Sequence, residues 1–217
     1  MKRFLYILIA MCFSGALLAQ HQNLRIGVTV SPHFSWLNPD SKRVNSEGTK
    51  PGFQGGLVVE NYFSDNYAFT TGLTIGSFGG KLSYSDTISM ETNDGMVQVL
   101  PNDEISYKLQ YISIPLGLKM KTNRIGYFTY YAQMGLTAQF NIKAKATSAV
   151  LENQSINKEV NLLSMSYYFG GGLEYNIGGN TSVILGVRYD NGFMDCLKTE
   201  RSKDNLNYVT IHIGVMF

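Results

Sequence analysis

The chain has 217 residues, of which 44% are hydrophobic, 12% aromatic and 16% charged, with a formal net charge of +2. Its length fits one domain with an ordinary core, and the low charge and many aromatics argue against a disordered chain. Lys2 and Arg3 lie in an expected export segment, which leaves 16 basic residues against 16 acidic ones. This balance argues against a nucleic-acid binder that works through a basic face.

Residues 1–19 have the three-part plan of a secretory signal peptide. A basic start at Lys2 and Arg3 is followed by an apolar stretch from Phe4 to Leu18 and the small residue Ala19. The apolar stretch is shorter than the roughly 20 residues that a membrane-spanning helix needs. We therefore expect cleavage after Ala19, with residues 20–217 forming the mature domain. Cys196 is then the one remaining cysteine, and its polar surroundings predict an unpaired loop residue.

From Asn23 onward, apolar and polar residues alternate with a period of two, which is typical of β-strands. One parity is apolar and uncharged, and the other is mostly Gly, Ser, Thr and Gln. A soluble sandwich would instead carry its charges on the outward face. The pattern therefore predicts an all-β fold, an eight-stranded antiparallel transmembrane outer-membrane β-barrel with apolar faces toward lipid. The eight expected strands lie at 24–36, 53–63, 67–75, 112–120, 128–140, 167–175, 183–189 and 209–217.

The connections alternate between short and long. Three short turns, at 64–66, 122–126 and 178–180, are rich in Asn, Asp and Gly. Long polar stretches separate the other strands, and they cover residues 38–50, 80–104, 143–161 and 191–205. Outer-membrane barrels have short periplasmic turns and long external loops. We expect the cell outer membrane as location, with both termini periplasmic, the long loops extracellular and aromatic residues near both ends of the strands.

One expected strand is irregular. Pro115 removes a backbone donor from the ladder, and Tyr107, Leu109 and Tyr111 have the opposite parity to Ile112. A β-bulge between Tyr111 and Pro115 would account for both features.

The polar parity carries a few ionisable side chains that would face the lumen. An eight-stranded barrel is just wide enough for its own side chains, so we expect these groups to pair and plug it, with a narrow pore as the alternative. Arg25 and Glu60 lie toward the same ends of adjacent strands and form the first expected pair. The candidate lumen cluster consists of Arg25, Glu60, Lys119, Glu174, Arg188 and His212.

Several segments resemble a known family, the PorT-like outer-membrane β-barrel proteins of Gram-negative bacteria, a group also labelled porin family. The segments that carry the resemblance are residues 24–28 (LRIGV), 110–119 (QYISIPLGLK), 170–175 (GGGLEY), 187–192 (VRYDNG) and 214–217 (GVMF). The resemblance implies the barrel and its location in the cell envelope. The family has no common set of catalytic residues that the resemblance could assign to this chain. The family's namesake is tied to protein export and gliding, and we do not transfer that role.

Function stays open between three classes. The leading expectation is a non-enzymatic structural or surface-interaction barrel, and a narrow pore or an accessory barrel of a secretion or gliding complex is the alternative. His33 and Ser35 are spaced as in lipid A deacylase barrels, but both have lumen parity and neither an Asn after Ser35 nor an orienting carboxylate is present. We expect no catalytic residue, metal or cofactor. The expected partners are outer-membrane lipid and the barrel-assembly machinery, whose recognition terminal Phe217 would suit. Envelope or secretion-complex proteins are candidate partners, and nucleic acid is not expected.

Overall fold

The computed structural model describes residues 23–92, 95–150, 153–198 and 202–217, so the expected signal peptide lies outside the described residues. Within these ranges, eight long antiparallel strands close into a barrel, as the alternating pattern predicted. Closure comes from two ladders: the first strand pairs with the last, and β8 pairs with β10. The eight strands are β1 (Leu24–Pro39), β3 (Lys50–Ser64), β4 (Tyr67–Tyr84), β7 (Glu104–Lys121), β8 (Phe128–Thr147), β10 (Leu163–Gly178), β11 (Thr181–Asp195) and β12 (Asp204–Met216).

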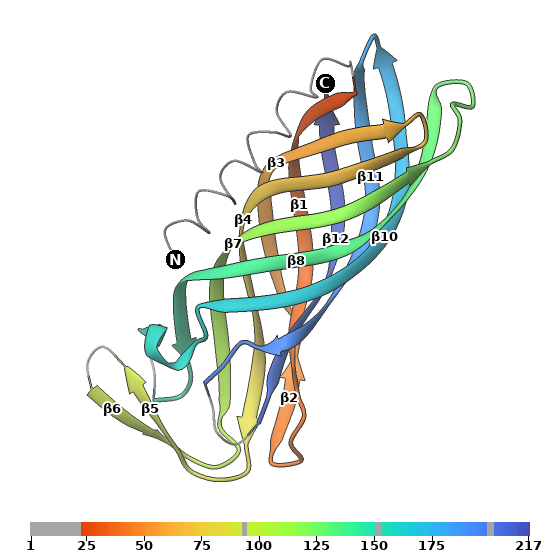
Figure 1. Ribbon diagram of the computed structural model, residues 1–217. Coiled ribbons are helices and arrows are strands. Elements are labelled where there is room, and N and C mark those ends of the chain that lie inside the picture. The colour runs from red at the N-terminus through yellow and green to blue at the C-terminus, as the bar shows by residue number, and fades with distance from the viewer. Residues whose placement is uncertain (1–22, 93–94, 151–152, 199–201) are drawn as a thin grey trace, which may run out of the picture.

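The two ends of the barrel differ. One end, the short-turn end, holds the β3–β4, β7–β8 and β10–β11 turns and the C-terminus, at the upper right of Figure 1. The other end, the long-connection end, holds the smaller elements in the lower part of Figure 1. These elements are β2 (Val44–Gly48), β5 (Ile88–Thr92), β6 (Gly95–Val99), β9 (Gln154–Ser155) and a 3-10 turn, η2 (Asn157–Glu159). None of the described helical turns has the length and apolarity of a membrane-crossing helix.

The outward side chains of the barrel form an apolar band. On β7 this band runs from Ile112 to Met120, about 27 Å along the strand and roughly 20 Å high after the usual tilt. Aromatic rings lie at both edges of the band, as expected: Phe128 packs on Tyr175 near the short turns, and Trp36 stacks on Tyr189 toward the other end. A band of this height matches the hydrocarbon layer of an outer membrane.

The strands run further than the sequence pattern predicted, because the pattern inverts beyond the apolar band. On β7, Ile105, Tyr107 and Leu109 point inward and are buried, while Lys108 and Gln110 point outward. Odd-numbered residues face inward along the whole strand, so the bulge predicted near Tyr111 to Pro115 does not lie in β7 itself, although the β7–β8 ladder shifts register at Gln110 and Tyr111. The register shift at this level lies in the β8 partner, which has one extra residue between Asn141 and Lys143.

The inverted parts of the strands enclose an apolar core, which we call the outer core. It fills the barrel at the long-connection end and includes residues from the connections that were predicted to be polar loops, such as Ile88 of β5 and Ile156. Its largest fully buried side chains include Tyr107, Tyr111 and Tyr208. The described part of the long connections therefore builds structure on the barrel. The outer core consists of Leu37, Val44, Phe78, Leu82, Tyr84, Ile88, Met90, Val99, Ile105, Tyr107, Leu109, Tyr111, Ala144, Ala146, Ile156, Val160, Cys196, Leu197, Leu206 and Tyr208.

Candidate functional site

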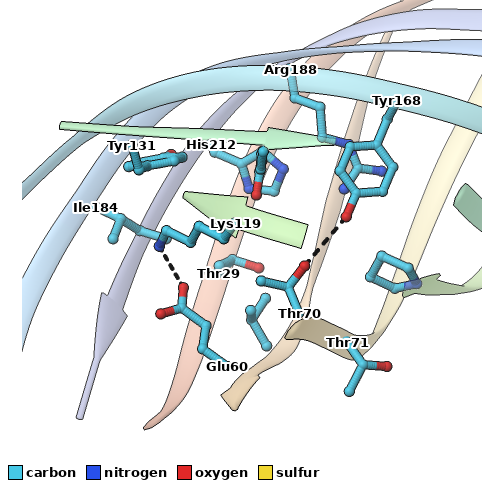
Figure 2. A pocket seen from close by; sticks show the side chains of 13 residues that line it. Thr29, Glu60, Thr70, Thr71, Lys119, Tyr131, Tyr168, Ile184, Arg188 and His212 are labelled. Atoms are coloured by element: carbon cyan, nitrogen blue, oxygen red, sulfur yellow. Dashed lines mark hydrogen bonds and ion pairs between the residues drawn. The ribbon is translucent and has the colours of Figure 1, made fainter. Parts of the chain in front are cut away.

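Four of the six predicted lumen residues meet near the short-turn end of the barrel. Lys119 of β7 is central: its Nζ lies 2.5 Å from Glu60 Oε1 on β3 and 2.6 Å from Glu174 Oε1 on β10. Lys119 and Glu60 are each 2% exposed, and Glu174 is 4% exposed. One ammonium group thus bridges two carboxylates across the interior. Figure 2 shows the Lys119–Glu60 contact within the lining of the lumen.

Arg25 completes this group but does not favour the partner that the sequence suggested. Arg25 and Glu60 are direct cross-strand partners on β1 and β3, and their charged atoms lie 3.8 Å apart. A closer partner is Glu174, whose Oε2 accepts a hydrogen bond from Arg25 Nη1 at 2.9 Å. The guanidinium reaches past its neighbouring strand because Glu174 projects into the same narrow space.

Two residues that contact these carboxylates were missed by the sequence analysis. Lys121 lies 3.8 Å from Glu174, and the Tyr62 hydroxyl donates a hydrogen bond of 2.6 Å to Glu60. Both residues have inward parity on their strands, which was the available signal. We call Arg25, Glu60, Lys119, Lys121 and Glu174 the charged layer.

Arg188 and His212 lie outside the charged layer, further along the barrel. Arg188 makes two hydrogen bonds to Asp190, of 2.6 and 2.7 Å, and lies over the ring of Tyr168 at 3.9 Å. His212 Nδ1 is 3.3 Å from the Ser31 hydroxyl. Asp190 was also missed, although it shares the inward parity of Arg188 two residues earlier. The six predicted residues therefore form two levels instead of one cluster.

Glycines let two tyrosine rings cross the lumen between these levels. A Cβ at Gly186 would lie 2.2 Å from the Tyr131 hydroxyl, and one at Gly117 would lie 2.0 Å from the Tyr168 hydroxyl. Tyr131 also packs on the Lys119 ammonium, 4.3 Å from the ring centre. Small residues on the polar parity thus make room for large side chains on facing strands.

Little space remains at the centre of the lumen. A cavity of about 30 Å³ lies among Glu60, Lys119, Tyr131, Tyr168 and Arg188, and Figure 2 shows these side chains pointing into it. This volume holds one or two water molecules. An ordinary organic substrate or a hydrated ion would need several side chains to move.

His33 and Ser35 do not have the geometry of a nucleophile and its base. The His33 ring stacks on Phe78 with the centroids 4.4 Å apart. The Ser35 hydroxyl accepts a hydrogen bond from the Gly79 amide and donates one to the Lys50 carbonyl. No hydrogen bond joins His33 to Ser35 in the described part of the chain. In the same described ranges, no group of three His, Cys, Asp or Glu side chains is placed to hold a metal ion.

Cys196 is unpaired and lies in the connection after β11, as predicted, but its polar sequence surroundings did not indicate its burial. It is fully buried in the outer core, and its thiol donates a hydrogen bond to the Asp204 carbonyl at 2.7 Å. Burial, with the carboxylates of Asp204 and Asp195 nearby, raises the pKa of the Cys196 thiol well above its usual range. The thiolate is therefore disfavoured in the folded protein.

We expect the thiol of the folded chain, residues 20–217, to resist maleimide at pH 8, with fewer than about one in ten molecules labelled while an exposed thiol reacts fully. Mass spectrometry before and after denaturation measures this. The matched control is Ser85→Cys, since Ser85 is exposed in the turn after β4 and its substitution adds one reactive thiol. Rapid labelling of the folded protein at Cys196 would contradict the closed outer core.

Comparisons with known proteins fit this architecture. Neisserial surface protein A (NspA) superimposes with a TM-score of 0.54 at 13% identity, covering 90% of this chain and 96% of its own. This likeness shows the fold alone. OprG of Pseudomonas aeruginosa gives a TM-score of 0.49 at 10% identity, covering 91% of this chain and 97% of OprG. Ail, the attachment invasion locus protein of Yersinia pestis, gives 0.38 at 17% identity, covering 90% of this chain and 100% of Ail.

No curated protein sequence matches this chain significantly. A family model described as outer membrane protein beta-barrel domain matches residues 18–211, which is most of the chain. Together with the closed barrel and its outward apolar band, this match explains both the fold and the outer-membrane location. The protein belongs to the outer membrane protein β-barrel domain family.

Proposed function

We propose that this protein is a non-conducting, non-enzymatic outer-membrane barrel that displays the structure at its long-connection end outside the cell. In this orientation the short-turn end and both termini are periplasmic. The observation that carries the proposal is the filling of the lumen at two heights. The charged layer crosses it near the short turns, and the outer core crosses it at the other end.

The two fillings would block passage for different physical reasons. In the charged layer, Lys119 holds side chains from β3 and β10 together, so opening it would separate buried opposite charges. In the outer core, side chains such as Tyr107 and Leu109 are almost completely buried, so the packing leaves no open path for water between them. An ion crossing the barrel would have to disrupt both, and this argues for a plug over a narrow pore.

We expect the protein to show no stepwise conductance in planar lipid bilayers. The measurement is a current trace of refolded protein at high salt, with a general porin in the same apparatus as the positive control. Correct folding and insertion are checked by heat-modifiable migration on gels. Discrete openings in proportion to inserted protein would contradict the plug and favour the narrow pore.

One observation favours a second function, that of an accessory barrel in a larger envelope complex. The β5–β6 hairpin projects beside the barrel at the long-connection end (Figure 1), and Met96 and Leu100 are 72% and 61% exposed. Exposed apolar residues on a projecting hairpin suit contact with another protein. The native mass after extraction in mild detergent separates the two functions: one barrel with its detergent belt supports the first, and a much larger assembly supports the second.

A further inference from the structure

Three lysines gather on the outside of the barrel just beyond its apolar band. Lys108 extends from β7, and Lys143 and Lys145 extend from β8. The residues that alternate with them, such as Leu109 and Ala144, are buried in the outer core. The lysine side chains therefore point away from the barrel interior.

The charges of these lysines are not compensated within the described residues. Lys108 and Lys145 are direct partners in the β7–β8 ladder, an arrangement that is destabilising for like charges. Nearby, Lys81 has a carboxylate partner, Glu104, at 2.8 Å. No hydrogen bond or ion pair engages the ammonium groups of the three clustered lysines in the described part of the chain. An anion bound between them would remove the repulsion.

A cavity of about 140 Å³ lies between these lysines. It is polar, and its lining consists of Lys108, Gln110, Lys143, Lys145 and Asn153. The two amide side chains add hydrogen-bond donors to the three ammonium groups. The positive potential also reaches Lys50 on β3, two strands from β7, where burial and the charges of Lys108 and Lys81 lower the pKa of the Lys50 ammonium. The cavity thus offers donors and positive charge to a compact anion.

The height of the cavity indicates where the anion comes from. Ile112 and Phe140 face each other across β7 and β8 in the apolar band, and Gln110 and Lys143 form a pair two β7 residues further along. Lys108 lies about 13 Å along the strand from Ile112, which corresponds to about 10 Å of height after tilt. This is the depth at which lipid headgroups lie.

We propose that this cavity binds a phosphate group of the phosphorylated glycolipid of the outer leaflet. The assignment to the outer leaflet rests on the proposed orientation of the barrel. A free phosphate ion has the same chemistry, but the lipid also places acyl chains against Phe140 and Ile142, which are 39% and 47% exposed directly beside the cavity. We therefore assign the site to the lipid, which would hold the barrel at a fixed depth in the membrane.

The test is native mass spectrometry of the detergent-purified protein titrated with bis-phosphorylated lipid A. We expect one tightly held lipid on the wild type and at least about tenfold weaker binding by Lys108→Gln/Lys143→Gln/Lys145→Gln, because each charge near such a surface contributes substantially. Lys42→Gln/Lys198→Gln/Lys203→Gln removes the same charge from exposed positions elsewhere at this end and should bind like the wild type. The Lys→Arg triple variant should retain the lipid. Heat-modifiable gel migration shows whether each variant is folded.

Different ligands separate the possible outcomes. Lipid A without its phosphates should bind at least about tenfold more weakly than the bis-phosphorylated form. Equal binding of the two forms of lipid A would overturn the site. An equal loss of lipid binding in the Lys108→Gln/Lys143→Gln/Lys145→Gln variant and in its Lys42→Gln/Lys198→Gln/Lys203→Gln control would do the same. Binding of inorganic phosphate as tightly as lipid A would overturn the assignment to a lipid. The titration in detergent does not depend on membrane orientation, which protease cleavage of the β5–β6 hairpin in intact cells tests separately.

Discussion

Lys119→Met is expected to lower the free energy of unfolding by about 3–5 kcal/mol, the usual cost of removing one partner from a buried ion pair. The substitution keeps much of the side-chain volume but leaves Glu60 without its 2.5 Å contact. Glu60 then retains the Tyr62 hydroxyl and a longer contact with Arg25, which lies 3.8 Å away. These groups cannot replace a buried ammonium. Urea titration in detergent, followed by the fluorescence of the single tryptophan, Trp36, measures the loss.

The double variant Glu60→Gln/Lys119→Met provides the decisive comparison. It removes the uncompensated carboxylate and leaves Arg25 and Lys121 to neutralise Glu174. We expect it to be more stable than Lys119→Met alone by roughly half of the original loss, because the larger cost lies in the orphaned charge. Lys42→Met, at an exposed position, should change stability by less than about 0.5 kcal/mol. A loss below about 1 kcal/mol for Lys119→Met would indicate a hydrated lumen instead of a packed one.

The barrel could be predicted from sequence because lipid imposes one simple requirement on the membrane-spanning strands. Residues such as Leu116 and Leu136 must be apolar on the outward side, and a period of two then identifies every strand within the band. Strand number, antiparallel order and the alternation of short and long connections follow from this pattern. Beyond the band the outward side faces water, so the requirement reverses. Tyr107 and Leu109 consequently looked like an error in register, although β7 continues through them without interruption.

The interior was harder to predict than the strands. The alternation along a strand identifies the residues that face the lumen, but it does not show how far a long side chain extends across the lumen. Arg25 was assigned to its cross-strand neighbour Glu60, whereas its nearest carboxylate, that of Glu174, is on β10. Lys121 and Asp190 share the same parity and could have been included from sequence. The burial of Cys196 could not be predicted from the sequence, because it depends on how the long connections fold over the end of the barrel.

Leu109→Ala is expected to destabilise the protein by about 2–5 kcal/mol, because the substitution removes a buried isopropyl group from a packed site and leaves a cavity. Leu109 is fully buried in the outer core. Leu116 provides the matched control on the same strand, since it is 60% exposed and points toward lipid. Leu116→Ala should cost at most about 2 kcal/mol, because mobile acyl or detergent chains fill the space and only the transfer of the side chain is lost.

The two leucine variants should also differ in how they open. Loosening the outer core exposes the long-connection end first, so Leu109→Ala should become sensitive to protease near β5 and β6 at urea concentrations that leave the barrel folded. Leu116→Ala should be cleaved only as the whole barrel unfolds. The measurement combines timed proteolysis, peptide identification and the urea titration of both variants. Equal stability losses and identical cleavage sites would mean that the outer core is no better packed than the lipid-facing band. The proposal that the outer core blocks the long-connection end of the lumen would then be wrong.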